Sequence, residues 1–238
     1  MTDLPAQTDP LAQADPLAQA DPLRRLVAVM DRLRSPGGCP WDAEQTHATL
    51  VPYVLEEAYE VAEAVESGDR DHLREELGDL LLQVVFHARV AQEDPDHPFD
   101  LDDVADTLVA KLVRRHPHVF ADADGVTDAD AVNRQWDRIK GEEKQRESVL
   151  DGVPLALGAL TRAQKVASRA ARAGLDVAVP APGGSDLGAR LLALVLQARA
   201  AGQDAEGELR RATAAWEARL RAAESDGAAD QQVGRHGS

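Results

Sequence analysis

Two short acidic motifs are the part of this sequence best suited to chemistry. Residues 56–60 read Glu-Glu-Ala-Tyr-Glu, and residues 75–79 read Glu-Glu-Leu-Gly-Asp. On a helix, residues three or four apart share one face, so each motif places two carboxylates one turn apart. The two pairs are Glu57 with Glu60, and Glu76 with Asp79. Carboxylate oxygens gathered in this way are ligands for hard cations such as Mg²⁺, which in turn bind phosphates.

The alternative is that these acids form an ordinary solvated face. Such a face usually carries basic residues between the acids, because like charges one turn apart destabilise a helix by about 0.2–0.5 kcal/mol per pair. No Lys or Arg occurs between His47 and Arg70. Asp79 also lies within an apolar run, where a carboxylate is costly to bury unless it is paired or bound to metal. The sequence therefore favours a metal site over a solvated face.

The helices that carry the motifs must pack side by side for the carboxylates to meet. Apolar residues at helical spacing predict one helix over about 49–66 and another that begins near Asp71. Gly68 lies between them and is a natural helix stop. If the two helices pack antiparallel through a short turn there, all four carboxylates can converge on one point.

The remainder of the chain is predicted to be helical as well. Helices are expected to begin at Asp21 and Asp100, which are favourable N-cap residues, and a further helix is expected over about 127–145. Leu, Val and Ala dominate the apolar residues, which favours helix over sheet. No alternating segment is long enough to predict a strand. The expected fold class is all-α.

A change in composition along the chain predicts a large domain followed by a smaller unit. A proline-containing six-residue repeat indicates a disordered leader over 1–20. The other predicted segments are a catalytic domain over 21–150, a connecting helix over 151–176, a linker over 177–186, a second helical unit over 187–224 and a disordered tail over 225–238.

Composition argues against several classes of function. A formal net charge of −16 disfavours nucleic-acid and membrane partners, whose anionic surfaces require clustered Lys and Arg. An anionic ligand would therefore need a metal to mediate its binding. Cys39 is the one cysteine, which fits a reduced, cytoplasmic setting. The first residues lack the pattern of a signal peptide, and no stretch approaches the roughly 18 apolar residues of a membrane span.

The acidic motifs together with four flanking segments resemble the MazG family of all-α nucleoside triphosphate pyrophosphohydrolases. The flanking segments are Gly-Cys-Pro-Trp-Asp at 38–42, Arg-His-Pro-His-Val-Phe at 115–120, Trp-Asp-Arg-Ile-Lys at 136–140 and Arg-Ala-Gln-Lys at 162–165. The resemblance covers about residues 23–176 in the same order. It implies a helical bundle that cleaves a nucleoside triphosphate between the α and β phosphates, releasing the monophosphate and pyrophosphate.

The same resemblance implies roles for individual residues. The positions that match the Mg²⁺ ligands, with Mn²⁺ as a possible substitute, are Glu57, Glu60, Glu76 and Asp79. The expected catalytic carboxylates are Glu56, as a base for the attacking water, and Glu60. The positions that match substrate contacts are Lys111, Arg115, Trp136 and Lys140. By analogy with the family, the protein is expected to be a homodimer.

Several alternatives stay open at this level. Lys111 with Arg115 can equally be an exposed basic edge, and Trp136 can be a core residue. The substrate can be narrower, as in the dUTPases or phosphoribosyl-ATP pyrophosphohydrolases, or the protein can be a non-catalytic nucleotide or metal sensor. In the second helical unit Ala189 stands where a metal-binding Asp is expected, which predicts a degenerate copy that binds no metal.

Overall fold

A computed structural model describes residues 21–121, 148–175 and 186–234, together with Val132, Gln135, Trp136 and Ile139. These residues contain helices and no strand, which confirms the all-α fold class. The predicted leader, most of the predicted linker and Lys140 lie outside the described residues. The chain divides into two compact units, Met1–Val126 and Thr127–Ser238, and each is described by itself.

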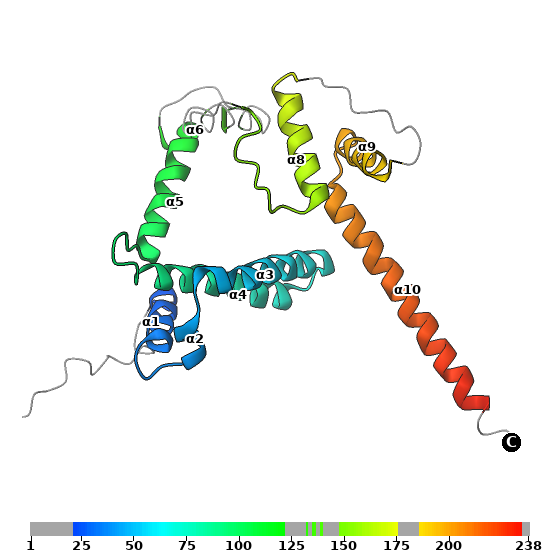
Figure 1. Ribbon diagram of the computed structural model, residues 1–238, viewed down its shortest axis with the longest axis horizontal. Helices are drawn as coiled ribbons and strands as arrows, with labels where there is room; N and C mark the ends of the chain where they lie inside the picture. Colours follow the sequence, from blue (N-terminus) through cyan, green and yellow to red (C-terminus); the bar gives the residue numbers. More distant parts are fainter. Residues whose placement is uncertain are drawn as a thin grey trace, which may run out of the picture. The chain divides into compact units, whose positions relative to one another are not determined.

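The first unit is built around one central helix, α4 (Figure 1). The helices of this unit are α1 (Pro22–Arg34), α2 (Pro40–Glu44), α3 (His47–Ser67), α4 (Arg70–Ala91), α5 (Leu101–Arg115) and α6 (Pro117–Phe120). Helix α4 contacts α1, α3 and α5. In Figure 1, α5 begins beside the end of α4 and runs away from the α3–α4 pair.

Side-chain caps fix where the long helices of this unit begin. Asp21 accepts hydrogen bonds from the backbone N–H groups of Leu23 and Arg24, as its N-cap position predicts. Asp100 forms a capping box with Asp103 at the start of α5. Gly68 ends α3 with φ +74°, a conformation that glycine adopts without a steric penalty. The predicted helix starts at Asp21 and Asp100 and the predicted stop at Gly68 are confirmed, whereas the start of the predicted helix over about 127–145 lies outside the described residues.

Two short helices of the first unit are absent from the sequence prediction. Helices α2 and α6 contain 5 and 4 residues, and each begins at a proline. Proline at the first helical position is favourable because its fixed φ already matches the helix. One turn of helix is too short to show a periodic pattern, so these segments resemble loops in the sequence.

Four buried side chains form the core of the first unit. They are Met30 from α1, Leu50 from α3, and Val85 and Phe86 from α4. Trp41 of α2 covers the edge of this core, with its ring centroid 6.3 Å from that of Phe86 and 5.9 Å from that of Tyr53. Trp41 remains 49% exposed, so it covers the core from the surface.

A buried arginine joins α1 and α2 to the end of α4. The Arg34 side chain is 5% exposed, and its Nε lies 2.8 Å from Oε1 of Glu93. It also donates to the backbone carbonyl of Asp42 at 2.5 Å. The hydrogen bond from Arg34 is the largest cause that lowers the pKa of Glu93, and the charges of Arg34 and Arg89 act in the same direction. This network holds the Cys-Pro-Trp segment against the central helix.

The second unit contains the helices α8 (Ala159–Arg172), α9 (Leu187–Ala200) and α10 (Ala205–Gly234), which contact one another. Gln164 of α8 connects them, because it donates to the carbonyl of Gln203 and accepts from the N–H of Ala205. Helix α10 continues past residue 224, where the sequence predicted a disordered tail. The added segment contains Ala and Gln, which are good helix formers, and no proline.

No helix among the described residues combines the length and the apolar character that crossing a bilayer requires.

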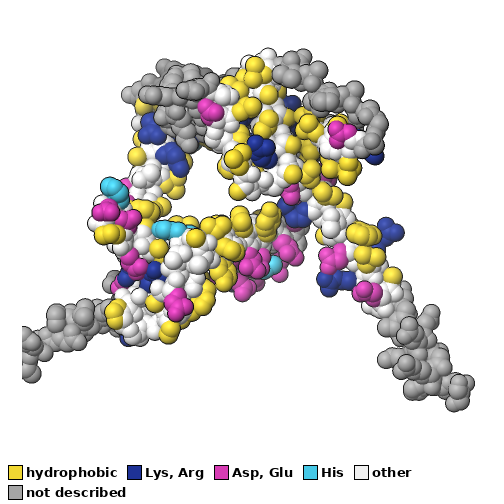
Figure 2. All heavy atoms as spheres, viewed as in Figure 1, with side chains coloured by type: hydrophobic (Ala, Val, Ile, Leu, Met, Phe, Trp, Pro, Cys, Tyr) yellow, Lys and Arg dark blue, Asp and Glu magenta, His cyan; other side chains and the backbone are white. Residues whose placement is uncertain are grey.

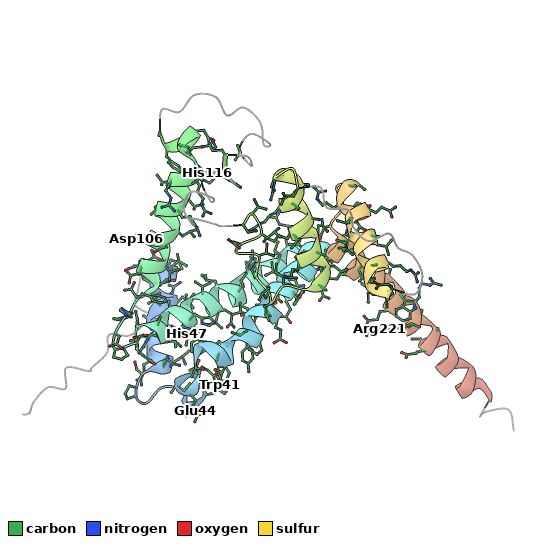
Figure 3. The ribbon with its side chains drawn as sticks, turned by 45° about the horizontal axis from the view of Figure 1, so that its top comes forward. Trp41, Glu44, His47, Asp106, His116 and Arg221 are labelled. Atoms are coloured by element: carbon green, nitrogen blue, oxygen red, sulfur yellow. The ribbon has the colours of Figure 1, made fainter. Side chains whose placement is uncertain are left out.

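A histidine pair joins the start of α3 to the last turns of α4. His47 Nδ1 lies 2.8 Å from His87 Nδ1, and the two ring planes differ by 4°. Figure 3 shows His47 beside α4. A hydrogen bond between two Nδ1 atoms requires one donor and one acceptor, so it holds one proton. Burial, followed by the charge of His47, lowers the pKa of His87.

This pair predicts an acid-sensitive contribution to stability. Because folding lowers the pKa of His87, the unfolded chain binds the proton more readily. The contribution is present above about pH 6.5 and is lost as the pH falls through the folded pKa. Between pH 7.5 and pH 5, the free energy of unfolding of wild type should fall by about 0.5 kcal/mol more than that of His87→Gln. This value is the low end of the contribution of one hydrogen bond, and thermal unfolding measures it. Equal losses in the two proteins would contradict the prediction.

Candidate metal centre

Three carboxylates from α3 and α4 meet in the first unit. They belong to Glu57, Glu76 and Asp79, and one oxygen from each lies within 4.8 Å of the others. The two helices are antiparallel, because α3 ends and α4 begins at the turn around Gly68. Glu76 and Asp79 are one turn apart on α4 and face Glu57 across the helix pair. The predicted convergence of the two motifs is confirmed for these three residues.

The burial of this group is unusual for carboxylates. Glu76 is 8% exposed, and Glu57 and Asp79 are half-buried. Within the residues that the structure describes, no Lys or Arg forms an ion pair with the three carboxylates. Figure 2 shows acidic side chains next to hydrophobic ones on the α3–α4 pair. Buried like charges without a Lys or Arg partner are costly, so the group has the character of a cation site.

Glu60 extends the group along α3. It lies outside the set of three, one turn along α3 from Glu57, and its charge helps to raise the pKa of Glu57. Burial is the largest cause that raises the pKa of Glu57, followed by the charges of Asp79 and Glu60, the hydrogen bond to Glu60, and the charge of Glu76. A cation bound among these carboxylates would replace the proton that their mutual repulsion favours.

The other acids of the two motifs point elsewhere. Glu56 and Glu75 are exposed, and neither belongs to the group of three in the described part of the chain. Each is adjacent in sequence to a member of the group, and one residue turns a helix by about 100°. The role of Glu56 as a base therefore stays a prediction.

One contact in this region could not be expected from the motifs. His72 Nε2 lies 2.9 Å from Oε1 of Glu76, one turn further along α4. The sequence signal for it is the spacing of four residues on one helix, which is common and is rarely informative by itself.

Two of the predicted substrate-binding residues, Lys111 and Arg115, are not gathered around the acidic group in this chain. Lys111 and Arg115 are half-buried on α5, which leaves the end of α4 and runs away from the α3–α4 pair (Figures 1 and 3). Trp136 is half-buried in the second unit, and Lys140 lies outside the described residues. The structure brings Glu57, Glu76 and Asp79 together and places Lys111 and Arg115 on a separate helix.

Comparison with known proteins identifies the family. Residues 45–120, which include α3 and α4, match the MazG nucleotide pyrophosphohydrolase domain. An uncharacterized 26.1 kDa protein of Streptomyces cacaoi is 54% identical over 200 residues, which cover 84% of this chain and 81% of that protein. The chain belongs to the MazG family. The resemblance based on the motifs is thereby confirmed.

Two relatives of this MazG protein have names that state an activity. The nucleoside triphosphate pyrophosphohydrolase of Escherichia coli K12 is 51% identical over 156 residues, which are 64% of this chain and 58% of that protein. The nucleoside triphosphate pyrophosphohydrolase/pyrophosphatase MazG of Thermotoga maritima is 44% identical over 153 residues, which are 63% of this chain and 57% of that protein. The chain thus matches little more than half the length of these two relatives.

The raised pKa of Glu57 leads to a prediction about the metal-free MazG protein. At neutral pH, Glu57→Gln removes the repulsion from Glu60, Glu76 and Asp79. At about 0.2–0.5 kcal/mol for each of these neighbours, the free energy of unfolding should rise by about 0.5–1.5 kcal/mol. Wild type gains a proton at Glu57 as the pH falls, so the difference should disappear below about pH 4.

Thermal unfolding with and without Mg²⁺ tests this prediction. Mg²⁺ should stabilise wild type and should stabilise Glu57→Gln much less, because the variant has lost a charged ligand. A metal-free variant that is less stable than wild type at neutral pH would show that the carboxylate of Glu57 is satisfied without a cation.

Proposed function

We propose that this MazG protein is a Mg²⁺-dependent nucleoside triphosphate pyrophosphohydrolase with a role in maintaining the nucleotide pool. It would cleave the bond between the α and β phosphates to give the monophosphate and pyrophosphate. The observation that carries the proposal is the convergence of Glu57, Glu76 and Asp79 within the matched MazG domain. The names of the E. coli and T. maritima relatives support the reaction type.

The residues that would hold the metal are Glu57, Glu60, Glu76 and Asp79. All of their donor atoms are carboxylate oxygens, the ligands that Mg²⁺ prefers, and Mn²⁺ accepts the same set. When bound, the ion would neutralise the polyphosphate and polarise its phosphoryl oxygens. The buried position of Glu76 supports a fixed ligand, because a buried side chain has few alternative rotamers.

The protein's own residues would supply a proton acceptor and the substrate contacts. Attack of water on a phosphoryl group breaks the bridging P–O bond and releases one proton, which a carboxylate must accept. Glu56 is the proposed acceptor, since it is exposed and next to Glu57 in the sequence, and Glu60 would assist. Lys111 and Arg115 would bind phosphates. Trp136 and Lys140 would contact the nucleotide.

A narrower substrate is the second candidate function. A dUTPase-like or phosphoribosyl-ATP-specific enzyme would use the same acidic group. The relatives named above carry the general nucleoside triphosphate description, which favours the broad substrate class. A non-catalytic sensor would not need the full set of four acids.

Measurement of pyrophosphate tests the activity. The purified protein is incubated with a panel of triphosphates and Mg²⁺, and pyrophosphate is resolved from orthophosphate. Asp79→Asn and Glu60→Gln should each lower the rate at least about 100-fold, because losing a metal ligand removes several kcal/mol of transition-state stabilisation. Glu75→Gln, an exposed acid on the same helix, is the matched control and should keep the wild-type rate. Orthophosphate alone, or no turnover of any triphosphate, would refute the proposal.

A homodimer would bring the missing basic residues to the acidic group. The outer face of α3 and α4 exposes large apolar side chains, namely Val51, Leu55, Tyr59, Leu77 and Val84, each 41–55% exposed. Helix α5 exposes Leu108, Val109, Leu112 and Val113 to 43–55%. Apolar surface of this extent favours association with a second copy. We propose that Lys111 and Arg115 serve the acidic group of the other copy.

Complementation between inactive subunits tests this arrangement. One subunit carries Asp79→Asn, and the other carries Lys111→Ala with Arg115→Ala. If each site combines acids of one copy with bases of the other, the purified heterodimer contains one intact site and should recover about half of the wild-type activity. If each site lies within one copy, both sites are defective and the heterodimer should stay inactive.

The remaining proposals concern location and the second unit. The net charge of −16 and the single cysteine support a cytoplasmic protein without a nucleic-acid or membrane partner. The second unit, with Ala189 in α9, would bind no metal and would serve folding or dimerisation. Leu187, Leu191 and Leu194 of that helix are 46–62% exposed, whereas Val195 is buried.

A further inference from the structure

We propose that His72 is a positioning residue for the metal centre and acts by orienting Glu76. The proposal rests on the proposed function in one respect, namely that Glu76 is a metal ligand. His72 Nε2 lies 2.9 Å from Oε1 of Glu76, which is ion-pair distance. A carboxylate with one oxygen held by this contact presents its other oxygen to a cation.

The capped first turn of α4 holds His72 in position, so that His72 can in turn orient Glu76. Asp69, the N-cap of α4, accepts hydrogen bonds from the backbone N–H groups of Asp71 and His72. His72 therefore lies in a capped first turn, one helical turn before Glu76, where a side-chain contact between the two is geometrically favoured. The chain of contacts runs from the cap to the imidazole and from the imidazole to the buried carboxylate.

The burial of the two partners shows why the contact matters. The Glu76 side chain is 11% exposed, whereas the His72 side chain is 38% exposed. Glu76 has little access to water, so its hydrogen bonds must come from the protein. In the described part of the chain, His72 is the one basic side chain paired with the acidic group. Without it, Oε1 of Glu76 would lose this contact, and the carboxylate would be free to rotate away from Glu57 and Asp79.

Mg²⁺ binding in the absence of nucleotide is the direct test. Calorimetry on the full chain should show affinity about 10–100-fold weaker for His72→Ala, the usual effect of losing a residue that orients a metal ligand. His72→Gln retains an N–H donor at a similar reach and should restore most of the affinity. His97→Ala, an exposed histidine in the loop after α4, is the control and should bind as wild type does.

Kinetics give a second readout that a purely structural role would not produce. His72→Ala should require a higher Mg²⁺ concentration for half-maximal pyrophosphate release, and its rate at saturating Mg²⁺ should approach that of wild type. Wild-type Mg²⁺ affinity in His72→Ala, or equal weakening in His72→Ala and His72→Gln, would overturn the inference. If wild type itself neither binds Mg²⁺ nor releases pyrophosphate, the proposed function fails first, which is a distinct outcome.

Discussion

The antiparallel register of α3 against α4 is the constraint on which the metal centre depends. Two groups of side chains meet across this interface. His47 contacts His87 near the end of α4, and Glu57 meets Glu76 and Asp79 nearer the turn. A shift of one residue would rotate each side chain by about 100° and separate both groups. The turn at Gly68 and the cap at Asp69 hold the register by ending one helix and starting the next at fixed residues.

Hydrophobic burial decides this register against the repulsion of the acids. Met30, Leu50, Val85 and Phe86 are nearly fully buried, and each side chain of this size contributes about 1.5–3 kcal/mol. The like-charge pairs on the same helices cost about 0.2–0.5 kcal/mol each in a solvated setting. Burial in the core therefore outweighs the repulsion and keeps the desolvated carboxylates together, where they can bind a cation. Burial first, and then the charges of the neighbouring acids, raise the pKa of Glu57.

The helices of the second unit also pack against one another, but its described residues contain no such cluster of carboxylates. The Gln164 side chain joins α8 to the connection between α9 and α10 through hydrogen bonds to its backbone, and Ala189 occupies the position where an acid was expected. In the first unit, Arg34 and Glu93 form a corresponding polar connection between helices. Both connections pair each charge or amide with a partner, whereas the acidic group of α3 and α4 has His72 alone as a basic partner among the described residues. The Gln164 and Arg34–Glu93 contacts are therefore structural, whereas the acidic group has the character of a cation site.

The long helices, their caps at Asp21 and Asp100, the stop at Gly68 and the two acidic pairs are all predictable from the residues alone. These features are local, because capping and helical periodicity depend on residues within a few positions of one another. Three other relations follow from helix packing: Glu57, Glu76 and Asp79 form the tight group, His72 contacts Glu76, and Lys111 lies on a helix directed away from that group. Those relations depend on helix register and on the direction in which α5 leaves α4, and packing between distant segments sets both.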